Sequence, residues 1–524
     1  MKHENFLREN NARHFWHPMA HPAEMLDTPP MIITKAENVE VHNVDGQVML
    51  DAVGGLWNVN LGYSCEPIKK AIHDQLNLMP YCNTFRGITN DKAIELSYKL
   101  KEWFYSDGME KVFFTQGGSD SIDTAMRLVR QYWKVKGKID KIKFISLSKG
   151  YHGTHYGGAS LCGDPRFRRN YEPGVPGVFH IPAPYTYRNP FNEVNPEELT
   201  KKCMQSLEAI IASQGSDTIA AFVMEPIIGS GGVIVPHESF MKKVRKICDE
   251  NEILLIADEV ICAFGRTGEW TGSRLWNVKP DIMTIAKALT GGYFPMGATL
   301  MSSEISETIE KNKNALGMLG HGYTNSGNPV GAAAALAALD ETNKLNLASN
   351  AKARGAELNL GLNKLKSKHR IIGDVRGKGL MAAVELVEDP ETKKPASKDV
   401  VAKIYKTICD EGVLVRASGN NFIISPSLII TKDHVQKIVS AIAEERLDRE
   451  KWSTKFPVRS IEWCLKSNNL KLEDVDYITV PWNPAHNIYS SSSRWDSDIF
   501  WRGQLLSHIP SNLMKMISKG PVES

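Results

Sequence analysis

The stretch DIMTIAKALTGGYFPMGA, residues 281–298, carries a lysine where a buried strand is expected to end. A short apolar run leads to Lys287, and a Gly-Gly turn and a second apolar run follow it. Burial of a lysine ammonium is unfavourable unless another group compensates its charge. Lys287 is therefore expected either to extend to the surface along its aliphatic stem or to have a chemical role.

Short apolar runs like this one alternate with helical patterns along the chain. The other runs are KVFFTQ (111–116), KIKFISL (141–147), AAFVMEPI (220–227) and ILLIADEV (253–260). Between the last two, HESFMKKVRKICDEN places Phe240, Val244 and Cys248 four residues apart, which is typical of one face of a helix. This alternation predicts an α/β fold with a mostly parallel sheet and helices on both of its faces.

Polar and aromatic side chains stand where several of these strands end. They are Ser119, Tyr151, Glu225, Asp258 and Lys287, each of which ends a predicted strand or opens the following loop. Ligands of such folds bind beyond the carboxyl ends of the parallel strands. We therefore expect these five side chains to share one site.

Each residue also has a purely structural interpretation. Ser119 in GGSDS could cap a helix, and Asp258 could pair with a structural arginine. Tyr151 and the adjacent His152 could be packed core residues. GGSDS does not match the GxxxxGK[ST] pattern, which disfavours a nucleotide-binding loop. Taken together, however, an anion-binding helix start, an aromatic ring, a buried acid and a buried lysine are the groups that hold pyridoxal phosphate.

The bulk composition is that of an ordinary globular protein. The chain has 524 residues, of which 42% are hydrophobic and 23% are charged, so it is long enough for two or more domains. Its net charge of +3 is nearly balanced and gives no indication of a nucleic acid or an anionic membrane as a partner.

The cysteines and the N-terminal residues bear on the compartment. The eight cysteines (65, 82, 162, 203, 248, 262, 409 and 464) form no CxxC pair and no Cys/His cluster, which argues against disulfides and a structural metal site. The N-terminal MKHENFLRENNARHFWHPM mixes acids and bases without an apolar core, unlike a signal peptide, and no window is apolar and long enough to span a membrane. We expect a cytoplasmic protein.

A series of motifs gives the chain a family resemblance. Residues 12–440 resemble a class III aminotransferase of the pyridoxal-phosphate fold type I in the order and spacing of MLDAVGGLWNVNLGY, GGSDSIDTAMRLVRQY, YHG, MEPIIGSGGVIVP, LIADEVICAFGRTG, TIAKALTGGYFPMGA and HGYTNSGNPVGAAAALAAL. One departure is Asp120-Ser121, where many members have Glu-Ala, and we expect it to change local packing more than cofactor binding. The resemblance implies a large domain with a mostly parallel seven-stranded sheet and a smaller α+β domain.

The resemblance also implies a role for each residue around the cofactor ring. Lys287 would bind the cofactor aldehyde and then move a proton between substrate and cofactor carbons. Asp258 would pair with the pyridine nitrogen and keep it protonated, so that the ring can accept electrons. Val260 and Tyr151 would pack on the two faces of the ring.

The phosphate end of the cofactor draws on other residues. By the same resemblance, Gly118 and Ser119 would donate hydrogen bonds to the phosphate, and Glu225 would belong to the cofactor site. Thr324 would reach the phosphate of the neighbouring subunit's cofactor, which predicts a homodimer.

The substrate side is predicted from four further positions. Arg416 resembles the arginine with which the family binds the substrate carboxylate, and a guanidinium fork suits that group. Relatives that use 2-oxoglutarate typically carry Glu where this chain has Ser230, so the chain resembles the omega-amino-acid:pyruvate group. Trp57, Phe85 and Tyr151 would line the pocket. The predicted donor is an omega-amino acid or amine of the taurine, beta-alanine or diamine type.

Two alternatives remain open at this point. A fold type I racemase, aminomutase or decarboxylase would share the lysine and the cofactor. A non-catalytic relative could retain the fold for a partner of its C-terminal residues, although such a relative has no chemical reason to keep Lys287, Asp258, Ser119 and Thr324.

The predicted domain organisation ends in an additional segment. We expect residues 1–60 to start the small domain, 61–320 to form the large cofactor domain and 321–446 to complete the small domain. Residues 447–524 hold five of the eleven tryptophans. A segment that begins at residue 441 and continues into this tail (AIAEERLDREKWSTKFPVRSIEWCLKSNN and the following residues) resembles a fragment near the N-terminus of nodulation-type O-carbamoyltransferases, without the His-Asp-Ser-Ser segment of those enzymes.

Deletion of residues 448–524 tests whether the tail takes part in the chemistry. We expect the truncated protein to react with an amine donor at the rate of the full chain, because every predicted cofactor residue lies upstream. Its solubility is expected to fall where the tail's tryptophans cover apolar surface. The measurement is the absorbance change of the bound cofactor, and a soluble, dimeric, inactive truncation would show that the tail shapes the site.

Overall fold

The structure is a computed structural model that describes residues 2–312, 314 and 317–443. All of these residues belong to one compact unit of the chain, Met1–Leu447. The tail with its carbamoyltransferase-like segment lies outside the described residues.

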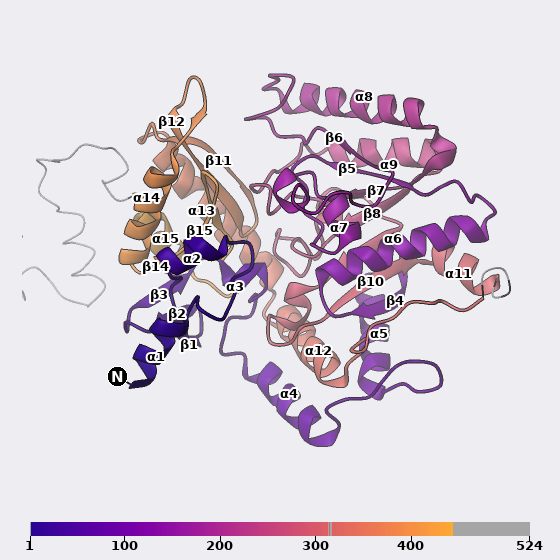
Figure 1. Ribbon diagram of the computed structural model, residues 1–524, viewed down its shortest axis with the longest axis horizontal. Helices are drawn as coiled ribbons and strands as arrows, with labels where there is room; N and C mark the ends of the chain where they lie inside the picture. Colours follow the sequence, from indigo (N-terminus) through magenta and orange to yellow (C-terminus); the bar gives the residue numbers. More distant parts are fainter. Residues whose placement is uncertain (1, 313, 315–316, 444–524) are drawn as a thin grey trace, which may run out of the picture. The chain divides into compact units, whose positions relative to one another are not determined.

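The centre of this unit is a seven-stranded sheet (Figure 1). Its strands are β4 (Met109–Thr115), β5 (Lys143–Leu147), β6 (Val178–Ile181), β7 (Ile219–Met224), β8 (Leu254–Asp258), β9 (Ile282–Ile285) and β10 (Gly297–Ser302). They lie in the order β4-β10-β9-β8-β7-β5-β6, and only β10 runs antiparallel to its neighbours. The predicted mostly parallel sheet is confirmed, and each predicted apolar run overlaps one of its strands.

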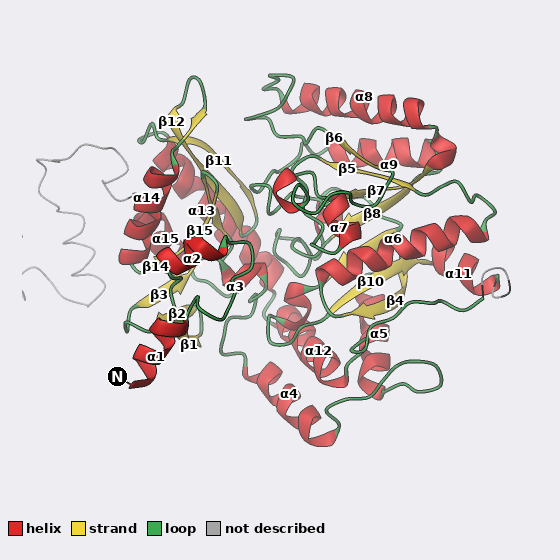
Figure 2. Cartoon of the chain, viewed as in Figure 1, coloured by secondary structure: helices red, strands yellow, loops and turns green. Residues whose placement is uncertain are grey.

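Helices cover both faces of this sheet (Figure 2). Side chains alternate along a strand, so Ala221 and Val223 of β7 pack with α6 (Gly118–Val135), whereas Phe222 and Met224 pack with α8 (Pro196–Gln214) and α9 (Phe240–Glu250). Both faces are therefore buried, which explains why the sequence of β7 is apolar throughout. The other helices of this part are α5 (Asp91–Trp103), α7 (Tyr156–Leu161), α10 (Gly272–Leu275), α11 (Ser303–Lys311) and α12 (Pro329–Lys344), and α4 (Glu66–Leu78) packs on α12.

Two smaller sheets share a second core. One contains β1 (Ile33–Glu37), β2 (Glu40–Asn43), β3 (Val48–Asp51) and β14 (Val413–Leu414). The other contains β11 (Ile372–Lys378), β12 (Met381–Asp389), β13 (Lys394–Pro395), β15 (Arg416–Ser418) and β16 (Asn421–Ile424). Helices α13 (Leu347–Lys366), α14 (Lys398–Asp410) and α15 (Lys432–Ala443) pack against them, and α1 (Lys2–Asn10), α2 (Pro22–Asp27) and α3 (Gly54–Trp57) complete the elements.

Pairing between distant strands bears on the predicted domains. β3 runs parallel to β14, with Leu50 opposite Val413, so N-terminal and C-terminal residues share one sheet. Helix α12 instead packs against α4 and α5, which the sequence analysis assigned to the large domain. The domain boundaries stay a prediction.

Membrane-spanning length was tested on the helices of the described residues. None of them is long and apolar enough to cross a membrane.

Candidate active site

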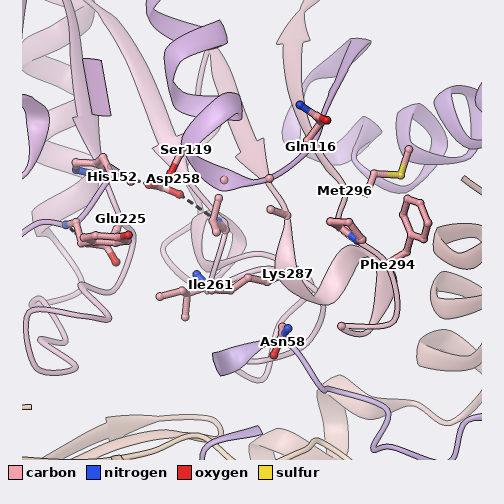
Figure 3. A pocket seen from close by; sticks show the side chains of 18 residues that line it. Asn58, Gln116, Ser119, His152, Glu225, Asp258, Ile261, Lys287, Phe294 and Met296 are labelled. Atoms are coloured by element: carbon pink, nitrogen blue, oxygen red, sulfur yellow. Dashed lines mark hydrogen bonds and ion pairs between the residues drawn. The ribbon is translucent and has the colours of Figure 1, made fainter. Parts of the chain in front are cut away.

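A cavity of about 410 Å³ opens at the carboxyl ends of the parallel strands (Figure 3). Its size is within the range of small-molecule sites. All five side chains that the sequence placed at this edge line it: Ser119, Tyr151, Glu225, Asp258 and Lys287. They follow β4, β5, β7, β8 and β9, so the strand order brings together residues that are up to 168 positions apart.

Lys287 follows β9 and opens a short 3-10 turn with φ +48°. A left-handed conformation is unfavourable for a residue other than glycine, by about 1 kcal/mol or more. Burial lowers the pKa of the Lys287 amine, and the carboxylates of Asp258 and Glu225 oppose only part of this shift. A lysine of lowered pKa is the form that can act as a nucleophile or base.

Asp258 ends β8 and is buried, at 4% exposed. Its Oδ2 lies 2.8 Å from Nδ1 of His152, and its Oδ1 accepts hydrogen bonds from Thr284 Oγ1 and the Val260 N–H, both at 3.2 Å. A carboxylate can only accept, so His152 Nδ1 carries the proton. The imidazole thereby holds the carboxylate in place beside the cavity.

The start of helix α6 forms another wall of the cavity. Gly117, Gly118 and Ser119 line it, and the N-cap Gly117 has no side chain to bond the first-turn N–H groups. A Cβ on Gly118 would lie only 2.9 Å from Cγ1 of Val260, so the close approach of the helix to β8 requires glycine. The N-terminus of an 18-residue helix is a favourable place for an anion such as phosphate.

Glu225 ties two loops to the cavity wall. Its Oε1 accepts from the Tyr151 N–H at 3.0 Å and its Oε2 from the Gly229 N–H at 2.8 Å. Burial raises the pKa of Glu225 to about 7, and it raises that of Tyr151 to about 12. Val260 lines the cavity together with Tyr151.

These residues fit pyridoxal phosphate. The buried amine of Lys287 suits the aldehyde, the carboxylate of Asp258 suits a protonated ring nitrogen, and the start of α6 suits the phosphate. Val260 and Tyr151 supply apolar surface for the ring. Within the described residues no group of three or more histidine, cysteine or acidic side chains could hold a metal ion.

Four other predicted residues do not line this cavity. Trp57 is buried at 1% exposed and belongs to the hydrophobic core. Phe85 is 52% exposed and lies near Gly322, and Thr324 is exposed, with its carbonyl accepting from Tyr81 at 3.0 Å. Arg416 is half-buried and close enough to Tyr151 for their charges to interact. The roles predicted for these residues stay predictions.

Several lining residues were not identified from the sequence. They are His152, Asn58, Gln116, Phe294 and Met296. Two of them, Phe294 and Met296, belong to the stretch that carries Lys287, and Figure 3 shows them on the side of the cavity away from Asp258 and His152. The apolar character of the residues after the Gly-Gly turn could have indicated Phe294 and Met296 as lining residues. The position of His152 next to Tyr151 could have indicated His152.

Comparison with known proteins agrees with this geometry. The family model "Aminotransferase class-III" matches residues 22–445. The chain belongs to the class III aminotransferases. The putrescine–pyruvate aminotransferase of Pseudomonas aeruginosa is 38% identical over 419 residues, which are 80% of this chain and 90% of that protein.

Other relatives are named for different substrates. The mitochondrial gamma-aminobutyrate transaminase 1 of Oryza sativa subsp. indica is 38% identical over 416 residues, which are 79% of this chain and 80% of that protein. Among solved structures, an amine transaminase from an uncultivated Pseudomonas species with bound pyridoxal phosphate is 42% identical, with a TM-score of 0.80 over 82% of this chain and 97% of that one. This class III aminotransferase is therefore a pyridoxal-phosphate enzyme of fold type I, as the resemblance implied.

Borohydride reduction of the holoenzyme should attach the cofactor to Lys287, because this half-buried side chain lines the cavity and its amine has a lowered pKa. Peptide mapping identifies the labelled residue. Lys141 is the matched control: its pKa is also lowered, to about 8, but it is buried and its Nζ donates to three backbone carbonyls away from the site. A label on Lys141 or another lysine would contradict the assignment.

Asp258→Asn should retain the cofactor but lose about 3 kcal/mol of transition-state stabilisation, roughly a hundredfold in kcat, because an amide does not hold the ring nitrogen protonated. Turnover per bound cofactor is the measurement. Glu259→Gln is the control, since Glu259 is the adjacent buried carboxylate and its side chain accepts hydrogen bonds from Gly272 and Ser273. It should lower stability but not turnover per bound cofactor, and near-normal turnover of D258N would refute the role of Asp258.

Proposed function

We propose that this aminotransferase moves the amino group of an omega-amino acid or a simple amine to pyruvate. The observation that carries the proposal is the state of Arg416. In the ranges 2–312, 314 and 317–443, no carboxylate forms an ion pair with Arg416. Its guanidinium is nevertheless partly removed from water, and this burial lowers its pKa. A half-buried guanidinium of this kind is available for the carboxylate of a substrate.

The position of Ser230 supports pyruvate as the acceptor. Ser230 offers no carboxylate that could pair with Arg416 and release it in alternation with the substrate. Pyruvate carries one carboxylate, which a single guanidinium can bind. A second carboxylate, as in 2-oxoglutarate, would need a further cationic partner or desolvation without one.

The residues around the cavity divide the chemistry among them. Bound pyridoxal phosphate supplies an aldehyde that takes up the amino group and a ring that accepts electrons. Lys287 Nζ takes the proton from the substrate carbon and returns it to the other reacting carbon. Asp258 keeps a proton at the ring nitrogen, and His152 orients Asp258. The start of α6 holds the phosphate, so that the reacting carbon stays within reach of Lys287.

A homodimer is part of this proposal. Leu78, Ile88, Ile94, Tyr98 and Met318 are each more than half exposed, which is unusual for side chains of this size. A second copy of the chain would cover them, and it would bring Thr324 to the partner's phosphate site. The cytoplasmic location stays a prediction, and some relatives are mitochondrial enzymes.

Membership of an aminotransferase family favours transamination over the racemase, aminomutase and decarboxylase alternatives. An amine-donor panel separates them directly, because only transamination needs a 2-oxo acid as co-substrate. The intact set of lining residues argues against a non-catalytic relative.

Pyruvate should be the better acceptor, because the second carboxylate of 2-oxoglutarate would be desolvated without a cationic partner. We expect kcat/KM for pyruvate to be about tenfold or more above that for 2-oxoglutarate, which corresponds to about 1.4 kcal/mol or more of lost binding free energy. The measurement uses one amine donor with both acceptors at the same pH. Arg416→Gln is the companion variant and should raise the KM for pyruvate. A preference for 2-oxoglutarate would overturn this proposal.

A further inference from the structure

The loop of residues 228–234, which contains Ser230, is held in a strained conformation. We call it the Ser230 loop. Val233 has φ +54°, which is rare for a β-branched side chain, and Gly232 has φ +118°. Ile228 and Ile234 pair across its base. Such a conformation persists only where the surrounding structure holds it.

The Ser230 loop supports the cavity from behind. Gly229 donates its N–H to Glu225, and a Cβ on Gly229 would lie 2.7 Å from Cδ1 of Ile261, which lines the cavity. A Cβ on Gly231 would lie 2.3 Å from the carbonyl oxygen of Lys149, two residues before Tyr151. Movement of this loop would therefore reach Glu225 and Tyr151.

Arg376 of β11 anchors the far end of the Ser230 loop. Its Nε donates to the Gly232 carbonyl at 2.7 Å, and its side chain is only 10% exposed. Its guanidinium lies over the ring of Tyr185 at 4.7 Å. The loop is thus attached to a strand whose sequence position is 144 residues away.

The same guanidinium anchors the hairpin that carries Arg416. Nη2 of Arg376 donates to Oδ1 of Asn421 at 2.6 Å. Asn421 opens β16 opposite Ser418 of β15, and β15 begins with Arg416 opposite Ile423. One planar group therefore joins the Ser230 loop to the β15–β16 hairpin.

Two acids fix the guanidinium in this position. Nη1 of Arg376 donates to Asp374 at 3.0 Å and to Glu385 at 3.1 Å. Burial opposes ionisation of Glu385, but the hydrogen bond from Tyr185 and the charges of Arg376 and Arg188 outweigh it and lower the pKa of this carboxyl. Arg376 is thus held by two acidic side chains and is not itself free to bind a substrate.

We propose that Arg376 is a positioning residue for recognition of the substrate carboxylate. It sets the Ser230 loop and the β15–β16 hairpin at a defined separation, and so places the Arg416 guanidinium relative to the cavity. This inference rests on the proposed role of Arg416 in carboxylate binding. The planar fork of arginine can serve both Gly232 and Asn421, whereas a lysine ammonium at the same site keeps the charge but cannot reproduce both contacts.

The test compares two donors that differ in the carboxylate alone, L-alanine and isopropylamine. The proteins are wild type, Arg376→Lys, Arg376→Gln and Asn421→Ala, each as holoenzyme. The matched control is Arg188→Lys, because Arg188 donates to the same Glu385 at 2.5 Å but contacts neither Gly232 nor Asn421. Cofactor absorbance follows each half-reaction, and pyruvate gives the reverse direction.

We expect Arg376→Lys and Arg376→Gln to raise the KM for L-alanine and pyruvate about tenfold or more, while kcat and the KM for isopropylamine stay within about threefold of wild type. Asn421→Ala should change the same constants in the same direction by less, and Arg188→Lys should change none of them. Equal losses with both donors, or the same losses in Arg188→Lys, would show a merely structural role and overturn the proposal.

Two further outcomes are informative. If both Arg376 variants fail to bind cofactor, Asn421→Ala decides, because it removes one acceptor and leaves the contact of Arg376 with Gly232; an unchanged KM for L-alanine in that variant overturns the proposal. A wild-type protein that reacts with neither donor would instead contradict the proposed function.

Discussion

Desolvation of the Lys287 ammonium is the constraint on which the rest of the site depends. A buried lysine without a compensating anion in contact loses its proton readily, and here burial outweighs the attraction of Asp258 and Glu225. The surrounding residues must keep water away and still leave the amine facing the cavity. Short strands that are buried on both faces meet this requirement, because the lysine can follow one of them directly into the cavity wall.

Among the described residues, the two buried carboxylates that line this edge each have hydrogen-bond partners. Asp258 has His152 and Thr284, and Glu225 has the N–H groups of Tyr151 and Gly229. The bonds from His152 and Tyr151 tie the ends of β8 and β7 to the loop after β5, so the arrangement is cooperative. For Lys287 the proposed partner is the cofactor itself, which agrees with its proposed role as the reactive group.

The cofactor half of the site could be predicted from the sequence because its residues follow strands that apolar runs reveal. Lys287, Asp258, Glu225, Tyr151 and Ser119 all meet at one edge for that reason. Their bonding partners were harder to predict, since His152 has an equally good structural interpretation. Trp57 could not be placed, because its position depends on a short irregular turn, α3, with non-helical backbone angles. The roles predicted for Phe85 and Thr324 stay predictions, because that of Thr324 involves a second copy of the chain and Phe85 does not line the cavity.

The proposed substrate-binding part of the site was harder to predict from the sequence, and Arg376 illustrates the reason. Its partners Gly232, Glu385 and Asn421 lie 144, 9 and 45 residues away, on elements that no local pattern connects. Neither the charge of Arg376 nor the periodicity of β11 indicates that it meets a strained loop behind Glu225. Residues that bind the cofactor are constrained by fixed chemistry at the strand ends. The proposed substrate-binding residues are constrained by the separation of the Ser230 loop and the β15–β16 hairpin. A buried guanidinium can set this separation, and a small change in packing can alter it. In this chain, the proposed contacts for the substrate carboxylate could therefore change without a change at the strand ends that form the cavity wall.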